Sequence, residues 1–174
     1  MIETESGADA QRAAQARSPQ RLSGYSRGGR RLRVVPKEPR GDQEIRVAIH
    51  SNADILEARR EGRELAARLG FSTIDCTLIA TAISELSRNI VLYAGDGEIR
   101  LCEERLVGTV GIAIAAIDHG PGIRDVRVAL QDGYSTSRGL GLGLPGVKRI
   151  MDEFEVVSKL RQGTTVTVKK WKSI

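Results

Sequence analysis

The sequence has few residues of the kinds that build metal centres and redox sites. Its 174 residues include two cysteines, Cys76 and Cys102, and two histidines, His50 and His119. The cysteines are far apart and match no metal-binding or redox spacing. This pattern argues against a zinc site, and it is typical of proteins in a reducing, cytoplasmic setting.

Long hydrophobic runs are also missing. No apolar stretch is long enough to cross a bilayer as a helix. The N-terminal residues lack the apolar segment of a secretory signal. We therefore expect neither a membrane span nor a secretory leader.

Positive charge is in excess only near the N-terminus. Residues 1–40 carry nine basic and four acidic side chains, a net charge of +5 that equals the formal net charge of the whole chain. Residues 41–174 carry 18 side chains of each sign. A nucleic-acid-binding face needs basic residues clustered within the folded part. We therefore expect the folded domain to bind no nucleic acid.

The chain is long enough for one domain with its own core. Residues 1–43 are rich in Ala, Arg, Ser, Gly and Gln and have no sustained apolar periodicity. We expect them to form a basic, disordered extension. It is either an electrostatic arm for an acidic partner or RNA, or a solvated extension without a role. Residues 44–174 are expected to form the folded domain.

Apolar residues from position 44 onward follow strand and helix periods in turn. Ser51 and Asn52 are candidate caps of the first helix, and Gly70 is its expected stop. The almost wholly apolar run Thr109–Ile117 predicts a central strand. The expected fold class is α+β, a two-layer sandwich in which a mixed, mostly antiparallel sheet carries helices on one face. The expected strands are 44–50, 98–103, 109–117, 155–159 and 164–171, the last two forming a hairpin, and the expected helices are 52–69, 72–93, 124–131 and 144–154.

Glu85 and Asn89 are the first candidate site residues. A spacing of four puts both side chains on one helix face, and neighbouring apolar residues put that face at the margin of the core. A carboxylate and a carboxamide there could hold a divalent cation and a water, because Mg²⁺ prefers oxygen ligands. The alternative is a solvated helix face on which Glu85 pairs with Arg88.

Asp118 is the second candidate, because it directly follows the apolar run. An acid at the end of a buried strand is costly unless it has a partner. Gly120, Pro121 and Gly122 then turn the chain tightly and leave room for a flat ligand. An adenine amino group would satisfy Asp118, and the alternative is a simple turn capped by the Asp118 side chain.

The third candidate is a glycine-rich stretch, Ser137–Gly146, ahead of the last expected helix. Its backbone N–H groups and the helix start form an anion site suited to phosphates. Gly141, Gly143 and Gly146 formally match a dinucleotide-binding motif, but they follow a polar segment instead of a strand. We therefore reject a dinucleotide fold. A lid over a nucleotide fits better than a linker, because the alternating leucines must pack.

The joint pattern resembles a known ATP-binding family. The boxes of the GHKL or Bergerat fold, which gyrase, Hsp90, histidine kinases and MutL share, occur here in the family's order. They are Glu85-x-x-x-Asn89, Asp118-x-Gly120-x-Gly122, Gly139–Gly143 and Gly163-Thr164.

Within that family the chain is most similar to the small bacterial anti-sigma and switch kinases. Residues 81–90, 132–137 and 144–154 look closest to the RsbT-type serine/threonine switch kinases of the stressosome. The resemblance covers about residues 44–172, and it offers no guide to the basic extension.

The resemblance implies a role for each of these residues. Glu85 would be the catalytic base, and Asn89 would bind Mg²⁺. Asp118 would accept a hydrogen bond from the adenine amino group with the support of Thr164. Lys148 would be a further cation near the phosphates. The other implied nucleotide contacts are Gly120, Gly122, Ile123, Arg138, Gly139, Leu140, Gly141, Leu142, Gly143 and Leu144.

The implied activity is that of a cytoplasmic, ATP- and Mg²⁺-dependent serine/threonine switch kinase. It would phosphorylate STAS-domain antagonist or scaffold proteins in a partner-switching stress response, and then bind an alternative partner such as a PP2C-type phosphatase. Two alternatives stay open. One is an anti-sigma factor of the same fold that binds a sigma factor directly, and the other is a nucleotide-dependent binding module without turnover.

Overall fold

Five strands form one sheet in residues 44–131 and 143–172, the part of the chain that the computed structural model describes. The strands are β1 (Ile45–Ile49), β2 (Gly97–Leu106), β3 (Thr109–Asp118), β4 (Glu153–Lys159) and β5 (Gly163–Trp171). Their spatial order is β1-β2-β3-β5-β4, so the apolar β3 is central as its sequence predicts. The α+β expectation is confirmed, but all pairings among these strands are antiparallel, so the sheet is not mixed there.

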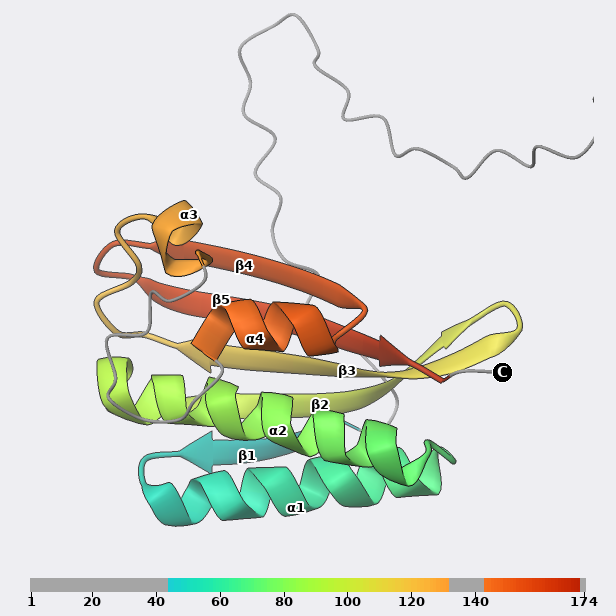
Figure 1. The fold of residues 1–174 in the computed structure, drawn as a ribbon. Helices are drawn as coiled ribbons and strands as arrows, with labels where there is room; N and C mark the ends of the chain where they lie inside the picture. Colours follow the sequence, from blue (N-terminus) through green and yellow to red (C-terminus); the bar gives the residue numbers. More distant parts are fainter. Residues whose placement is uncertain (1–43, 132–142, 173–174) are drawn as a thin grey trace, which may run out of the picture. The chain divides into compact units, whose positions relative to one another are not determined.

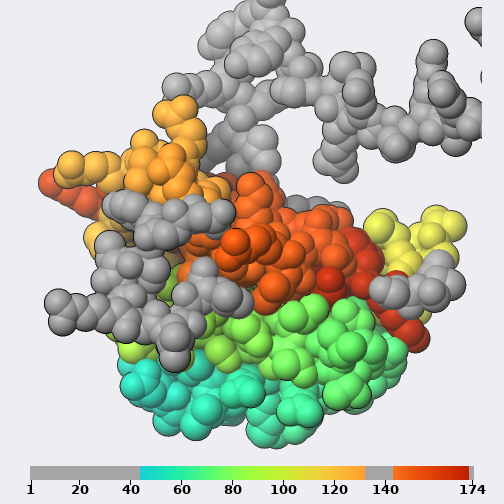
Figure 2. Space-filling view, in the orientation of Figure 1, coloured from blue at the N-terminus to red at the C-terminus, as the bar shows by residue number. Residues whose placement is uncertain are grey.

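Three helices cover one face of the sheet (Figure 1). They are α1 (Asn52–Arg68), α2 (Thr73–Asn89) and α4 (Gly143–Ile150), and a short helix, α3 (Val126–Ala129), follows β3. The space-filling view shows α2 lying between α1 and α4 (Figure 2). In the described ranges, no helix is long and apolar enough to cross a membrane.

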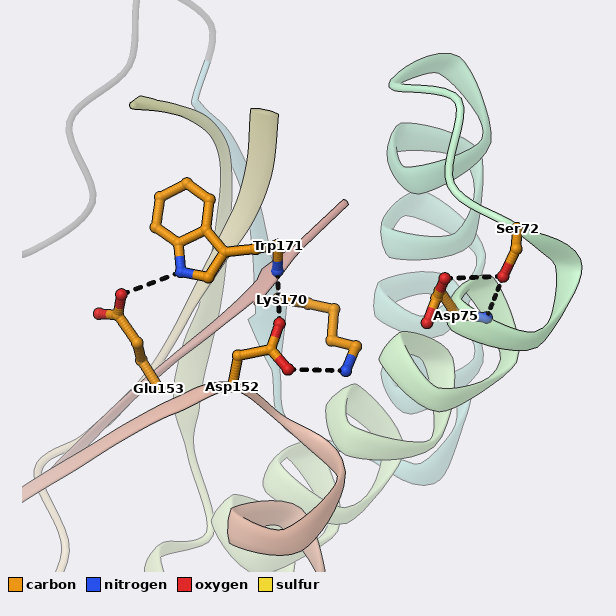
Figure 3. A network of polar contacts seen from close by, with 6 residues as sticks. All are labelled: Ser72, Asp75, Asp152, Glu153, Lys170 and Trp171. Carbon is orange, nitrogen blue, oxygen red and sulfur yellow. Dashed lines mark hydrogen bonds and ion pairs between the residues drawn. The ribbon is translucent and has the colours of Figure 1, made fainter. Parts of the chain in front are cut away.

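The first long helix begins at one of its expected caps, Ser51, and the second begins after Ser72, where the expected helix starts. The Asp54 carboxylate accepts hydrogen bonds from the backbone N–H and the hydroxyl of Ser51, at 2.8 and 2.9 Å. The Ser72 hydroxyl accepts one from the Asp75 N–H at 3.0 Å (Figure 3). Such bonds satisfy donors that a helix start leaves free. The pKa of the Asp54 carboxyl is lowered, chiefly because the His50 N–H also donates to it.

The core lies between the sheet and the helices. Ile79, Ile83 and Leu86 project from α2 at helical spacing and are almost completely buried. They pack with Ile112 and Ile114 of β3 in one apolar cluster. Each such side chain contributes about 1.5–3 kcal/mol of burial free energy. The cluster therefore holds α2, and with it Glu85 and Asn89, firmly against the sheet.

The end of α4 corrects the expected boundary of the last helix. The helix ends at Ile150 instead of Phe154, which lies in β4. The Asp152 carboxylate accepts hydrogen bonds from the Trp171 N–H at 2.7 Å and from the Lys170 ammonium at 2.9 Å (Figure 3). These contacts tie the chain to β5 just after the helix, and a local apolar pattern cannot reveal them.

Candidate functional site

Glu85 lies in the second half of α2, and only 8% of the residue is exposed. Its Oε2 accepts a hydrogen bond from the backbone N–H of Gly143, the first residue of α4, at 3.2 Å. Its Oε1 lies 3.5 Å from the guanidinium of Arg88. The alternative interpretation was a solvated helix face on which Glu85 pairs with Arg88. That ion pair is present, but Glu85 itself is buried. Both carboxylate oxygens are held, which suits a group that must receive a proton in a defined direction.

Asn89 is the last residue of α2 and lies one helical turn beyond Glu85. The residue is half-buried, and its side chain makes no hydrogen bond with the described part of the chain. A carboxamide in this position is expected to bind water or a ligand. Its oxygen is a suitable ligand for Mg²⁺, which keeps several waters and takes further oxygens from phosphates. Among the described residues, no group of three or more His, Cys, Asp or Glu side chains could hold a metal ion. A Mg²⁺ ion at Asn89 would therefore need further oxygen ligands from waters and phosphates.

A single π-helical turn, η1 (Ile90–Ala94), directly continues α2 and precedes β2. The sequence predicts an ordinary helix to Tyr93, so the type of this last turn is a correction. A Cβ on Gly120 would lie 2.6 Å from the Ala94 Cβ, so only glycine lets the loop after β3 approach η1 this closely. The contact brings the ends of α2 and β3 together, and π-turns of this kind are frequent at functional sites.

Asp118 ends β3, as its position after the apolar run predicts. Its Oδ1 accepts hydrogen bonds from the backbone N–H groups of Gly120 at 2.9 Å and Thr164 at 3.2 Å. The bond from the Gly120 N–H is the one expected of a simple turn capped by the Asp118 side chain, which was the alternative interpretation. Its Oδ2 receives no hydrogen bond from the described residues. One oxygen therefore holds the loop while the other remains available to an external donor.

Two glycines bring the loop after β3 against the β4–β5 hairpin. Gly122 has φ +74°, and a Cβ there would lie 2.4 Å from the carbonyl oxygen of Lys159. Gly163 has φ +97°, and a Cβ there would lie 1.9 Å from the carbonyl oxygen of Asp118. Left-handed backbone and close approach both require glycine at these positions. The segment Asp118–Gly122 and the turn at Gly163 are thus in direct backbone contact.

Ser158 of β4 lies where the loop after β3 meets the β4–β5 hairpin, although the sequence analysis did not single it out. Its Oγ accepts a hydrogen bond from the Ile123 N–H at 2.7 Å and lies 2.9 Å from the Thr164 Oγ1. The Ile123 N–H is therefore already occupied, and a ligand could contact Ile123 only elsewhere. Ser158 pairs with Thr164 in the hairpin register, and counting that register back from the turn is the signal that could have found it.

The glycine-rich stretch is described only at its end. Arg138, Gly139, Leu140, Gly141 and Leu142 lie outside the described residues, so their contacts with phosphates stay a prediction. Gly143 and Leu144 form the start of α4, where the Gly143 N–H donates to Glu85 and Leu144 packs against the core. Lys148 is exposed on α4.

Comparisons with known proteins identify the family of the chain. Residues 74–173 match the family model described as histidine kinase-, DNA gyrase B- and HSP90-like ATPase. The chain is 52% identical over 125 residues to the serine/threonine-protein kinase RsbT of Bacillus subtilis, covering 72% of this chain and 94% of the relative. It is 32% identical over 118 residues to the anti-sigma F factor of Caldanaerobacter subterraneus subsp. tengcongensis, covering 66% and 82%.

A solved structure has a similar fold. The crystal structure of the RsbU and RsbW domains of Rv1364c from Mycobacterium tuberculosis aligns with a TM-score of 0.52 at 19% identity. The alignment covers 76% of this chain and 33% of that one, so this chain spans about a third of its length. The family match extends over more than half of the sequence and includes Glu85, Asn89, Asp118 and Thr164. The chain therefore belongs to the histidine kinase-, DNA gyrase B- and HSP90-like ATPase family.

Proposed function

We propose that the chain is an ATP- and Mg²⁺-dependent serine/threonine protein kinase that phosphorylates STAS-domain antagonist or scaffold proteins in the cytoplasm. The observation that carries this proposal is the buried Glu85, held at both oxygens and one helical turn from Asn89. A family member that only bound nucleotide would not need a fixed carboxylate there. The 52% identity to a protein named as a serine/threonine kinase supports the same activity.

In this proposal Asp118 and Asn89 bind the two ends of the nucleotide. The free Oδ2 of Asp118 accepts a hydrogen bond from the adenine amino group, while Oδ1 keeps the loop in place. The carboxamide oxygen of Asn89 would help to hold Mg²⁺, which would neutralise charge on the phosphates. Residues 138–144 and Lys148 are assigned to the phosphates on the basis of the family resemblance.

Glu85 then serves as the base. It accepts the proton of the substrate serine or threonine hydroxyl as that oxygen bonds to the γ-phosphorus. The bond from the γ-phosphorus to the bridging oxygen breaks, and ADP leaves with the electron pair. Positioning and charge neutralisation do most of the work in phosphoryl transfer, so few reactive side chains are needed.

Phosphorylation would change the partner's surface. The new phosphate adds about −1.5 to −2 charges at neutral pH, which weakens an interface built around a neutral hydroxyl. The kinase would then be free to bind an alternative partner, such as a PP2C-type phosphatase. A partner-switching role of this kind follows from the likeness to RsbT and is tested by identifying the phosphorylated protein.

Replacement of Glu85 by Gln tests the assignment of the base. Glutamine keeps the size and the acceptor for the Gly143 N–H but cannot take up the proton, so transfer should fall by about 10²- to 10⁴-fold. The affinity for ATP should change by less than about threefold, because neither nucleotide contact is removed. Transfer of radiolabelled γ-phosphate to a purified STAS-domain protein measures the first quantity, and calorimetry measures the second.

Glu64→Gln is the matched control. This carboxylate lies on α1 and is 49% exposed in an ion pair with Arg60, so its loss should leave transfer unchanged. Equal transfer by Glu85→Gln and the unmodified chain would remove Glu85 from the mechanism.

An anti-sigma activity is the second candidate, because several relatives at 30–32% identity are named anti-sigma F factors. The nucleotide site is the same in both proposals, so the partner distinguishes them. Capture of a purified sigma factor by the MgATP-loaded chain, with no capture of a STAS-domain protein, would favour this second candidate over the first.

A further inference from the structure

Ser158 is where three separate segments of the site meet. Its hydroxyl accepts a hydrogen bond from the Ile123 N–H in the loop after β3, at 2.7 Å. It lies 2.9 Å from the Thr164 Oγ1 and 3.3 Å from the Gly163 carbonyl oxygen, both at the start of β5. Thr164 in turn donates its backbone N–H to Asp118. Ser158 therefore joins the loop, the hairpin and, through Thr164, the adenine-facing carboxylate.

The Ser158 hydroxyl has a single proton to share among these neighbours. One lone pair receives the Ile123 N–H, so the proton can go either to the Gly163 carbonyl or to Thr164 Oγ1. In the first case the Thr164 proton is tied to Ser158, and Thr164 offers only lone pairs to a ligand. In the second case the Thr164 proton is free, and Thr164 offers a donor. The state of Ser158 thus sets what Thr164 can offer.

We propose that Ser158 is a positioning residue of the nucleotide site, which anchors the loop at Ile123 and directs the Thr164 hydroxyl toward the adenine subsite. It contacts neither nucleotide nor substrate and acts through these two neighbours. The inference rests on the proposed function, because it takes Asp118 and Thr164 as the adenine-binding pair.

The chemistry of adenine favours the second of the two proton arrangements. Adenine presents an amino donor beside a ring-nitrogen acceptor on its Watson–Crick edge, whereas guanine presents a carbonyl acceptor beside an N–H donor. Asp118 Oδ2 matches the adenine amino group. A neighbouring Thr164 that is free to donate matches the ring nitrogen. Ser158 then contributes to the choice of adenine over guanine, and its loss lets the Thr164 hydroxyl rotate freely.

Three variants test the proposal: Ser158→Ala removes the hydroxyl, Ser158→Thr keeps it, and Thr165→Ala is the matched control. Thr165 is the next residue on β5 and pairs with Val157 and Ile117 in register, away from the network. Loss of the Ser158 bonds should raise the Kd for MgATP about tenfold, with a smaller change for MgGTP. Ser158→Thr should restore the affinity, and Thr165→Ala should leave it unchanged.

Hydrogen exchange of the Ile123 amide in the nucleotide-free protein is a second readout, independent of activity. Exchange should be about tenfold faster in Ser158→Ala than in the unmodified chain or Thr165→Ala. If Ser158→Ala does not fold, Ser158→Cys keeps the size with a weaker acceptor and should show the same two changes.

The failures are distinguishable. A folded Ser158→Ala variant with unchanged MgATP affinity and unchanged Ile123 exchange overturns this inference and leaves the proposed function standing. An unmodified chain that binds no MgATP refutes the proposed function, and the adenine role of Ser158 falls with it.

Discussion

Replacement of Asp118 by Asn is the sharpest test of the adenine assignment, because the structure fixes which way the new amide must face. Oδ1 accepts the N–H groups of Gly120 and Thr164, so the amide oxygen has to take that position. The amide NH₂ then replaces Oδ2 and presents a donor to the adenine amino group, which is itself a donor. Loop anchoring is kept while base recognition is reversed.

The magnitude follows from the bond that is lost. A hydrogen bond to a charged acceptor contributes about 1.5–3 kcal/mol, so the Kd for ATP should rise by about 10- to 150-fold. Calorimetric titration with MgATP measures it. The unfolding free energy of Asp118→Asn should stay within about 1 kcal/mol of the unmodified chain, as thermal or denaturant unfolding can check.

Asp118→Ala separates the two roles of this carboxylate. It removes the acceptor of both backbone N–H groups as well as the base contact, so it should also lower stability by about 1–3 kcal/mol. An Asp118→Asn variant that binds ATP as tightly as the unmodified chain would refute the adenine assignment.

Two further predictions concern the fold. Gly163→Ala should destabilise the protein by about 2–4 kcal/mol, because a Cβ there meets the Asp118 carbonyl in a left-handed backbone. Gly108 has φ +82° and nothing within 4 Å, so Gly108→Ala should show the backbone strain alone, a loss of about 1 kcal/mol. Equal losses of unfolding free energy for the two variants in denaturant unfolding would contradict the close contact at Gly163. Burial and then Glu104 raise the pKa of Cys102 to about 11. Native Cys102 should therefore resist alkylation at pH 8, whereas the denatured chain reacts. Stability should also fall as the pH rises from about 8.5, where an unfolded thiol ionises, toward 11, and a Cys102→Ala variant should lack this part of the loss.

Local patterns were reliable where short-range physics decides the structure. The cap at Ser51, the helical spacing of the apolar residues in α2 and the apolar run of β3 all predict the elements that are observed. They failed at the end of α4. There Asp152 bonds to β5, and Phe154 enters the sheet.

In the candidate site too, local patterns identified the residues, but they did not predict the contacts between distant segments. A spacing of four is enough to place Glu85 and Asn89 on one helix face, and a strand end followed by glycines is enough to single out Asp118. No local rule predicts that the Gly143 N–H would donate to Glu85 or that Ser158 would bond to Ile123. Both contacts join residues far apart along the chain.

The sequence by itself determined the elements, the family and the chemical types of the site residues, because periodicity, caps and box order are written in neighbouring positions. Only the tertiary structure decided which oxygen of Asp118 receives no hydrogen bond from the described residues, which atoms contact Glu85, and that Ser158 lies within hydrogen-bond distance of Thr164. These are properties of directional hydrogen bonds between separate segments. They exist only once the sheet register and the packing of α2 against the strands have fixed those segments together.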